Sequence, residues 1–377
     1  MGAGLVGAAV ANELARAGYQ TAVFEAASQP AAGASCANSG ILHTGFDSPP
    51  GTLETDLIRD QALCWQAVFD NLQVPYRKTG AIMLAQSSDD AQRLPHIAET
   101  AAGNGVTVQL LNRAQLQSLE PGANANAALL IPDEAITDPY EVVRRLLSFV
   151  PVRYHARVTR IDPASNGAAL IYLDDAVKNA RVAINCAGLF ADELAADSLL
   201  KIIPRRGEFV AYAPSNRLTL EHILLPIPTP RTKGILVFPT LYGHVCAGPS
   251  ATDQADKNDW RPRGAALAHI RARASALYPI LSDLQPVAAW AGLRPSGHPR
   301  NYFIEWSARV PSMLSVAAIR STGLSACLGI ARYVHAALQE KGILPHGRQF
   351  AINRSEFDAR KPWWERSNEL HGVSGPC

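Results

Sequence analysis

The sequence predicts an α/β fold with two parts. One part is a domain with a central parallel sheet flanked by helices, and the other is a domain built on a mixed or antiparallel sheet. Three observations predict this division: a glycine-rich turn that opens a helix at the start of the chain, a buried strand at 182–188 that ends in small residues, and short β-rich runs between 202 and 306.

Composition limits the classes of function. The chain has 377 residues, enough for two domains, and 47% hydrophobic with 18% charged residues is typical of a soluble globular protein. A net charge of +2 gives no electrostatic case for nucleic acid. No uncharged apolar run is long enough for a membrane span, and no signal peptide is visible. We therefore expect a cytoplasmic protein, with peripheral contact at the inner face of the membrane left open.

The cysteine pattern argues against a metal site. The six cysteines are scattered and form no CxxC pair, so zinc and iron–sulfur centres are not expected. Buried or idle thiols in a reducing compartment explain them better.

The first 25 residues carry a dinucleotide-binding pattern. Gly2, Gly4 and Gly7 form a GxGxxG that opens an apolar helix, and a short strand after it ends in Glu25. The glycines allow a tight turn, a close approach of the backbone to a pyrophosphate and close packing of helix on strand. The helix N-terminus favours the phosphates, and a carboxylate at Glu25 accepts hydrogen bonds from ribose hydroxyls. The pattern predicts a Rossmann-like domain that binds an adenine dinucleotide.

The motif begins at the very start of the chain. A Rossmann-like sheet needs a buried strand before the glycines, and no residues precede Met1 to form it. We expect a missing segment, either through truncation or through a start placed several residues late. The alternative is a protein that lost the strand.

A second glycine-rich loop contains a candidate base. Residues 36–45 are mostly small, which favours close approach of the backbone to the cofactor, although a plain turn would also explain them. His43 stands between two glycines of this loop. A lone histidine is more often a packed side chain, but its position after the ribose-binding strand favours a catalytic role.

The remaining elements follow in order along the chain. An amphipathic helix is predicted over 52–72, a strand with a bend at Gly80 over 74–85, and a helix after the N-cap Ser87. Asp138-Pro139 predicts a helix start, and paired strands follow at 152–161 and 168–173. Further strands are expected at 106–111, 127–132, 202–211, 234–239, 244–248, 301–306 and 314–318, with helices over 112–119, 262–278 and up to about 338.

Two further features lie near the end of the sequence: a glycine-bearing loop and a pair of tryptophans. The glycine-bearing loop at 319–325 opens a helix and is placed to direct N–H groups at a negatively charged ring edge. In the tail, Trp363 and Trp364 either dock on the body or contact a membrane surface, and docking is favoured.

Several stretches together resemble one family. They are GAGLVG, VFE, ANSGILHTGF (37–46), VAINCAGLFADELA (182–195), PRRGEF (204–209), KGILVFPTLYGHVCAGPSATD (233–253), AGLRP (291–295) and STGLSA (321–326). They are similar to FAD-dependent oxidoreductases of the D-amino-acid-oxidase superfamily, in the branch of glycerol-3-phosphate dehydrogenases and oxidases and L-2-hydroxyglutarate dehydrogenases. The resemblance covers roughly residues 2–340.

The resemblance implies a discontinuous FAD-binding domain (1–75, 138–205 and 312–345), a substrate-binding domain (76–137 and 206–311) and a C-terminal tail (346–377). It implies that FAD is held by the residues Gly2, Gly4, Gly7, Glu25, Ser35, Asn38, Ser39, Val158, Ala187, Gly188, Gly323, Leu324 and Ser325.

The resemblance also implies roles in the reaction. His43 matches the proposed base of this branch, and Arg294, Lys233 and Ser321 match groups that bind an anionic substrate or support the flavin. Arg206 is a weaker candidate. Two features depart from the family: the cysteine-rich C-terminal segment of longer relatives is absent, and Glu54-Thr55 is unexpected in its helix.

The predicted reaction is oxidation of a small anionic hydroxy compound, with the hydride passing to flavin N5 and the proton to His43. sn-Glycerol 3-phosphate, giving dihydroxyacetone phosphate, is the first candidate and L-2-hydroxyglutarate the second. A flavin amine or amino-acid oxidase of the glycine- or sarcosine-oxidase type and a non-catalytic flavin-binding remnant remain alternatives. The electron acceptor is left open among quinone, oxygen and a redox protein.

Overall fold

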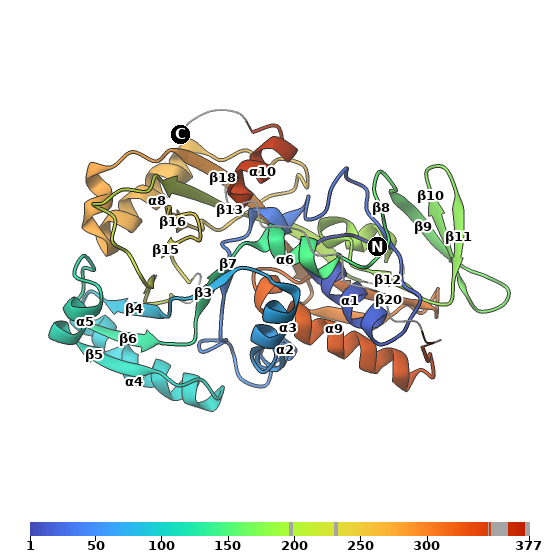
Figure 1. The fold of residues 1–377 in the computed structure, drawn as a ribbon, viewed down its shortest axis with the longest axis horizontal. Helices are drawn as coiled ribbons and strands as arrows, with labels where there is room; N and C mark the ends of the chain where they lie inside the picture. Colours follow the sequence, from blue (N-terminus) through green and yellow to red (C-terminus); the bar gives the residue numbers. More distant parts are fainter. Residues whose placement is uncertain (196–198, 230–232, 346, 348–360, 374–377) are drawn as a thin grey trace.

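The computed structural model describes residues 1–195, 199–229, 233–345, 347 and 361–373. The elements form two lobes (Figure 1). One lobe holds a parallel sheet with helices packed beside it, and the other is built on a large mixed sheet. The predicted α/β fold with both kinds of sheet is confirmed. Among the described helices, none has the length and apolar character needed to cross a membrane.

The first lobe is centred on parallel strands. Strand β1 pairs with β8, and β12 pairs with β20, which in turn pairs antiparallel with β19. The strand after residue 300, which the sequence grouped with the second sheet, therefore lies in the first lobe. The strands are β1 (Val23–Phe24), β8 (Val152–Arg153), β12 (Ala183–Asn185), β19 (Phe303–Trp306) and β20 (Met313–Ala317).

The first residues of the chain lie between β1 and β12. The Met1 amino group donates to the Ile184 carbonyl at 2.8 Å, and the Met1 carbonyl accepts from Cys186 N–H at 3.0 Å. On the other side, Gly2 N–H donates to the Phe24 carbonyl at 2.9 Å. Residues 1 and 2 thereby join the two groups of parallel strands.

Four helices pack beside these strands (Figure 1). Helix α1 (Leu5–Arg16) packs on α9 (Gly323–Glu340) and α6 (Pro139–Leu146), and α2 (Leu53–Ala62) packs on α9. Gly329 of α9 makes the contact with α2 close, because a Cβ atom there would lie 2.1 Å from the Leu57 carbonyl oxygen. As predicted, Asp138 caps α6: its Oδ1 accepts from two N–H groups of the first turn.

The predicted helix over 52–72 is two helices. Helix α2 ends at Ala62 and α3 (Trp65–Leu72) begins three residues later. The two helices bury different faces: α2 packs on α9, whereas Trp65 and Phe69 of α3 form edge-on contacts with Tyr76. A single straight helix cannot reach both surfaces, and Leu63 at the break is 87% exposed.

The second lobe is a mixed sheet of nine strands. Its order is β17-β13-β16-β15-β14-β4-β6-β5, with β18 also paired to β13. The long antiparallel pair β13·β18 runs in one register from Lys201 opposite His298 to Ala211 opposite Ala288. The strands are β4 (Ala81–Ala85), β5 (Gln109–Asn112), β6 (Ala127–Ile131), β13 (Lys201–Tyr212), β14 (Ile223–Pro226), β15 (Leu236–Pro239), β16 (Val245–Gly248), β17 (Thr252–Asp253) and β18 (Ala288–His298).

Helices accompany the second sheet, and the described residues also contain three short 3₁₀ helices. Ser87 forms the predicted N-cap of α4, with a complete capping box through Asp90. The α-helices are α4 (Ser88–Gly103), α5 (Arg113–Leu119) and α8 (Gly264–Leu277), with the short α7 (Ala191–Leu194) in the first lobe; the 3₁₀ helices are η1 (Ala34–Ala37), η2 (Gly188–Phe190) and η3 (Pro279–Asp283).

Two smaller sheets complete the fold. Strand β7 (Ala135–Thr137) pairs antiparallel with both β2 (Ile41–Leu42) and β3 (Tyr76–Lys78) between the lobes. The sheet β9 (Val158–Pro163), β10 (Ala169–Leu173) and β11 (Val177–Ala180) lies at the far end of the first lobe. The predicted strand over 152–161 is therefore interrupted, because the chain leaves β8 for β9 through His155 at a φ of 52°.

The described part of the tail docks on the body. Helix α10 (Trp363–Leu370) packs on η1 and β18, and both Trp363 and Trp364 are buried. Trp363 Nε1 donates to the Asn38 carbonyl at 2.9 Å, and Trp364 stacks on Trp290 of β18. The favoured interpretation of the two tryptophans is confirmed. The division of the chain into domains remains a prediction.

Candidate active site

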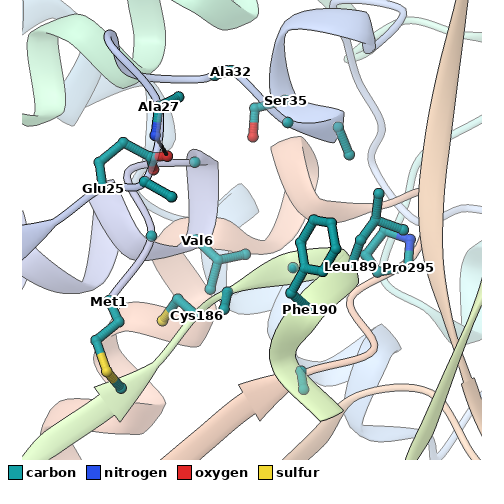
Figure 2. A pocket seen from close by; sticks show the side chains of 18 of the residues that line it. Met1, Val6, Glu25, Ala27, Ala32, Ser35, Cys186, Leu189, Phe190 and Pro295 are labelled. Atoms are coloured by element: carbon teal, nitrogen blue, oxygen red, sulfur yellow. Dashed lines mark hydrogen bonds between the residues drawn. The ribbon is translucent and has the colours of Figure 1, made fainter. Parts of the chain in front are cut away.

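A cavity of about 610 Å³ lies where the first lobe meets β18 and the tail. Figure 2 shows Glu25 and Met1 on one side of this cavity and Leu189, Phe190 and Pro295 on the other. Its wall comes from widely separated parts of the chain. Of the predicted cofactor residues, the wall contains Gly2, Gly4, Glu25, Ser35, Asn38, Val158, Ala187, Gly188 and Gly323.

The glycines at the start of the chain are held by close backbone contacts. A Cβ atom at Gly7 would lie 2.0 Å from the Gly2 carbonyl oxygen, and one at Gly2 would lie 2.5 Å from the Cys186 carbonyl oxygen. Gly4 precedes α1, and a Cβ atom there would come within 2.9 Å of Ser35 Oγ. Only glycine permits this approach of α1 to the strands.

Glu25 and Ser35 fix the loops around the N-terminus of α1. The Glu25 carboxylate accepts from Ala3 N–H at 2.6 Å and from Ala27 N–H at 2.9 Å. Ser35 Oγ accepts from Leu5 N–H at 2.9 Å. Each acceptor oxygen has a second lone pair, so Glu25 can also accept from a hydroxyl of a bound ligand.

The other predicted cofactor residues are placed differently. Gly7, Ser39, Leu324 and Ser325 do not line this cavity; Gly7 is used in packing, and Ser325 lines a second cavity. Asn38 shapes the loop itself, since its Oδ1 accepts from Gly40 N–H at 2.8 Å.

The residues present fit an adenine dinucleotide. The N-terminus of α1, a twelve-residue helix, lines the cavity and suits phosphates, and the Glu25 carboxylate beside it suits a ribose. Gly323 at the start of α9 also lines the cavity. FAD would be held by these groups. When bound, it supplies a ring that accepts a hydride.

His43 does not line this cavity but lines a second one. The backbone N–H of His43 donates to Ser325 Oγ at 2.8 Å, which fixes the His43 loop on the first turn of α9. Its Nδ1 lies 2.8 Å from Oε2 of Glu134, whose side chain is fully buried. The imidazole itself is 26% exposed and lines a cavity of about 570 Å³ together with Ser325, Arg59 and Lys78.

Glu134 is a site residue that the sequence did not single out. It lies 91 residues from His43, and nothing in the segment Pro132 to Thr137 marks it as different from a turn residue before a strand. A charged residue directly before three fully apolar or small strand positions is a weak signal of burial, and it becomes informative only once β7 is paired with β2.

Lys233 is paired with an acid of the His43 loop. Its ammonium lies 2.7 Å from Asp47 Oδ1, four residues after His43. Burial raises the pKa of Asp47, but the Lys233 ammonium and His43 outweigh this and hold it below its ordinary value. The Lys233 side chain is 60% exposed, and its ammonium has three donors, so donors remain for a further anion.

Arg294 lies on the face of β18 that packs against η1. Gly292 on the same face contacts η1, since a Cβ atom there would lie 2.8 Å from the Ala37 carbonyl oxygen. Arg294 donates to the Ser250 carbonyl at 3.1 Å and, among the described residues, forms no ion pair. Burial and the neighbouring Arg205 lower the pKa of Arg294 to about 10.

The two remaining candidates are placed less favourably. Arg206 is buried in an ion pair with Asp259 at 3.0 Å, so its charge is already matched. Ser321 is exposed just before α9, where Thr322 donates to Glu54 at 2.5 Å. The unexpected Glu54 therefore contacts the side chain of the residue before α9. Neither Arg294, Lys233 nor Ser321 lines either of the two cavities.

Comparison with known proteins gives one consistent family. A profile of the family "FAD dependent oxidoreductase" (DAO) matches residues 1–337. The glycerol 3-phosphate dehydrogenase of Caloramator mitchellensis is 28% identical over 89% of this chain and 72% of that protein. The L-2-hydroxyglutarate dehydrogenase of Escherichia coli K12 is 26% identical over 70% of this chain and 65% of that protein.

A solved structure has the same fold. The dithionite-reduced L-α-glycerophosphate oxidase of Mycoplasma pneumoniae, with FAD bound, superposes with a TM-score of 0.83 at 23% identity. The match covers 94% of this chain and 95% of that one. Because the family profile spans most of the sequence, this chain belongs to the DAO family of FAD-dependent oxidoreductases, and FAD is its cofactor.

Proposed function

We propose that the protein oxidises a small anionic hydroxy compound, with sn-glycerol 3-phosphate as the first candidate and L-2-hydroxyglutarate as the second. The two dehydrogenases of Caloramator mitchellensis and Escherichia coli support these substrates in that order, by identity and by coverage. The observation that carries the proposal is the arginine of β18.

Arg294 is a cation without a matching carboxylate in the described part of the chain. A guanidinium partly withdrawn from water is costly unless it is paired, and this cost lowers its pKa to about 10. One of its five N–H donors binds the Ser250 carbonyl, which leaves others for a ligand. The forked donor geometry suits a phosphate or a carboxylate equally well. Arg294 therefore orients the anionic group.

His43 is the proposed base. Oxidation of an alcohol requires removal of the hydroxyl proton, and an imidazole is the side chain best matched to that step near neutral pH. The backbone N–H of His43 donates to Ser325 Oγ, and its ring is held by the contact of Nδ1 with Glu134, so Nε2 is the nitrogen that takes the proton.

Lys233 is held beside the His43 loop by its ion pair with Asp47, and its exposed ammonium keeps N–H donors for a ligand. We assign it to the anionic end of the substrate together with Arg294. Its exposure makes it a weaker contributor, since an ammonium in water is strongly screened.

The test is the anaerobic absorbance of the FAD-loaded protein before and after addition of sn-glycerol 3-phosphate, L-2-hydroxyglutarate and glycine, each in a separate sample. Bleaching of the visible flavin band by sn-glycerol 3-phosphate supports the first candidate, and bleaching by L-2-hydroxyglutarate replaces it with the second. sn-Glycerol 1-phosphate and D-2-hydroxyglutarate serve as matched controls and should leave the band unchanged. Bleaching by glycine alone, or by none of the compounds, overturns the proposal.

A further inference from the structure

We propose that Glu134 is the positioning residue of the base: it holds His43 in the tautomer with the proton on Nδ1, which leaves Nε2 free to take the substrate proton. The inference rests on the proposed function and adds a residue that neither the sequence motifs nor the comparisons mark. It is carried by the contacts of one buried carboxylate.

Both oxygens of Glu134 are used, and they are used by two consecutive residues. Oε2 lies 2.8 Å from His43 Nδ1. Oε1 accepts from Thr44 N–H at 2.8 Å and from Thr44 Oγ1 at 3.0 Å. The side chain is fully buried, so these contacts are not shared with solvent.

The backbone holds Glu134 opposite the base. Strand β7 pairs antiparallel with β2, and Ala135 stands opposite Leu42. Glu134, the residue before Ala135, therefore faces His43, the residue after Leu42. The Glu134 carbonyl also accepts from Thr79 N–H at 3.3 Å and Gly80 N–H at 2.9 Å. The carboxylate is therefore placed by three segments and not by its own side chain alone.

Because the Glu134 carboxylate can only accept, it fixes which nitrogen of His43 carries the proton. An ionised carboxylate has no proton to donate, so the short contact with His43 requires the proton on Nδ1. Nε2 then carries the lone pair. When the substrate hydroxyl transfers its proton to Nε2, the resulting positive ring stands against a buried negative charge, which stabilises it without any rearrangement.

Glu134→Gln separates this role from simple packing. The amide oxygen takes the place of Oε1, where two Thr44 donors hold it, and the NH₂ group is turned towards Nδ1. His43 must then accept at Nδ1 and carry its proton on Nε2, so the base is blocked. We expect the rate constant of substrate-driven flavin reduction to fall by about 10²–10⁴. The half-saturating substrate concentration should change less than about threefold, because no anion-binding group is altered.

The chain offers a matched control. Glu120 is also a buried carboxylate, and its Oε1 lies 2.9 Å from Nδ1 of His222 and accepts from the His222 N–H. Neither residue lines the two cavities. Glu120→Gln therefore tests the loss of an equally buried histidine–carboxylate pair, and its reduction rate should stay within about threefold of the parent.

A double variant tests whether Glu134 acts through His43. In a His43→Ala background, Glu134→Gln should cause little further loss, since the ring that it positions is gone. Equal losses from Glu134→Gln in both backgrounds would indicate a structural role and overturn the proposal.

Imidazole ¹⁵N NMR of the FAD-loaded protein provides a readout that does not depend on activity. His43→Gln assigns the resonance. The parent should show the proton on Nδ1 of His43, and Glu134→Gln should move it to Nε2. A parent protein with the proton on Nε2 overturns the inference. If no tested compound reduces the flavin, the proposed substrate class fails, yet the tautomer still decides the role of Glu134.

Discussion

The guanidinium of Arg294 crosses the neighbouring strand at Gly207. A Cβ atom at Gly207 would lie 2.2 Å from Arg294 Nη2 and 2.8 Å from its Cζ. The two residues lie on adjacent antiparallel strands, with Arg205 directly opposite Arg294 and Gly207 one step along the same face. The missing side chain at the glycine of PRRGEF thus leaves the space that the guanidinium of the AGLRP arginine occupies.

This relationship predicts that Gly207→Ala displaces Arg294. Loss of a charge-assisted contact to the anion is worth about 1.5–3 kcal/mol, so the half-saturating substrate concentration should rise about 10- to 100-fold. The flavin spectrum should remain, because Gly207 does not line the cofactor cavity. Gly264→Ala is the control, since nothing lies within 4 Å of its Cβ position. An unchanged concentration dependence in Gly207→Ala would remove Arg294 from substrate binding.

His43→Ala should retain FAD while losing the reaction. The backbone contact of His43 with Ser325 does not need the imidazole, so the loop is kept. Without the general base, substrate-driven bleaching should slow by about 10²–10⁴, whereas bleaching by dithionite should be unaffected. Stopped-flow absorbance under anaerobic conditions measures both. Bleaching by substrate at the parent rate would show that His43 is not the base.

Gly7→Ala should weaken cofactor binding without contact with the cofactor. The new Cβ atom would meet the Gly2 carbonyl oxygen, and α1 would have to move away from the strands. Overpacking of this kind costs about 1–3 kcal/mol, which corresponds to about 5- to 150-fold weaker binding of FAD. Titration of the apoprotein with FAD, followed by flavin fluorescence, gives the constant. Gly103→Ala is the control because its Cβ position is open, and equal affinities in the two variants would contradict the prediction.

Acidification should loosen the tail. Burial lowers the pKa of His371 from 6.5 to about 4, and the ring stacks on Trp260 at 3.9 Å between centroids. Above pH 6.5 the His371 ring is neutral in both the docked and the undocked state, so its stacking on Trp260 is fully available. This contribution is lost as the pH falls towards 4, by up to about 3 kcal/mol.

Tryptophan emission between pH 7 and 4.5 measures this change, because Trp260, Trp363 and Trp364 lose their packing when the tail leaves. His371→Phe keeps a ring on Trp260 but does not titrate, so the difference between the two proteins isolates the histidine. Identical curves for both would mean that His371 does not govern the docking of α10.

The sequence predicted the parts of the fold that depend on local pattern. The glycines before α1, the Asp138 cap and the bend at Gly80 between β3 and β4 follow from short-range rules, and the structure agrees with them. The helix over 52–72 was divided because its two halves pack on different partners, and no periodicity within the segment reveals that.

Long-range pairings could not be predicted from pattern. Glu134 meets His43 only because β7 pairs with β2, and Lys233 meets Asp47 across 186 residues. The tryptophans of the tail fit either a protein surface or a membrane surface by their chemistry. Burial of both rings against β18 and η1 decides between these interpretations.

The wall of the cofactor cavity contains residues from Met1 to His371. During synthesis on the ribosome, the glycine turn emerges long before the stretch that carries His371. The pocket therefore cannot be completed while most of the chain is still being made, and α10 can dock only after η1 and β18 have come together. Closure of the cofactor pocket thus follows the synthesis of every segment that lines it.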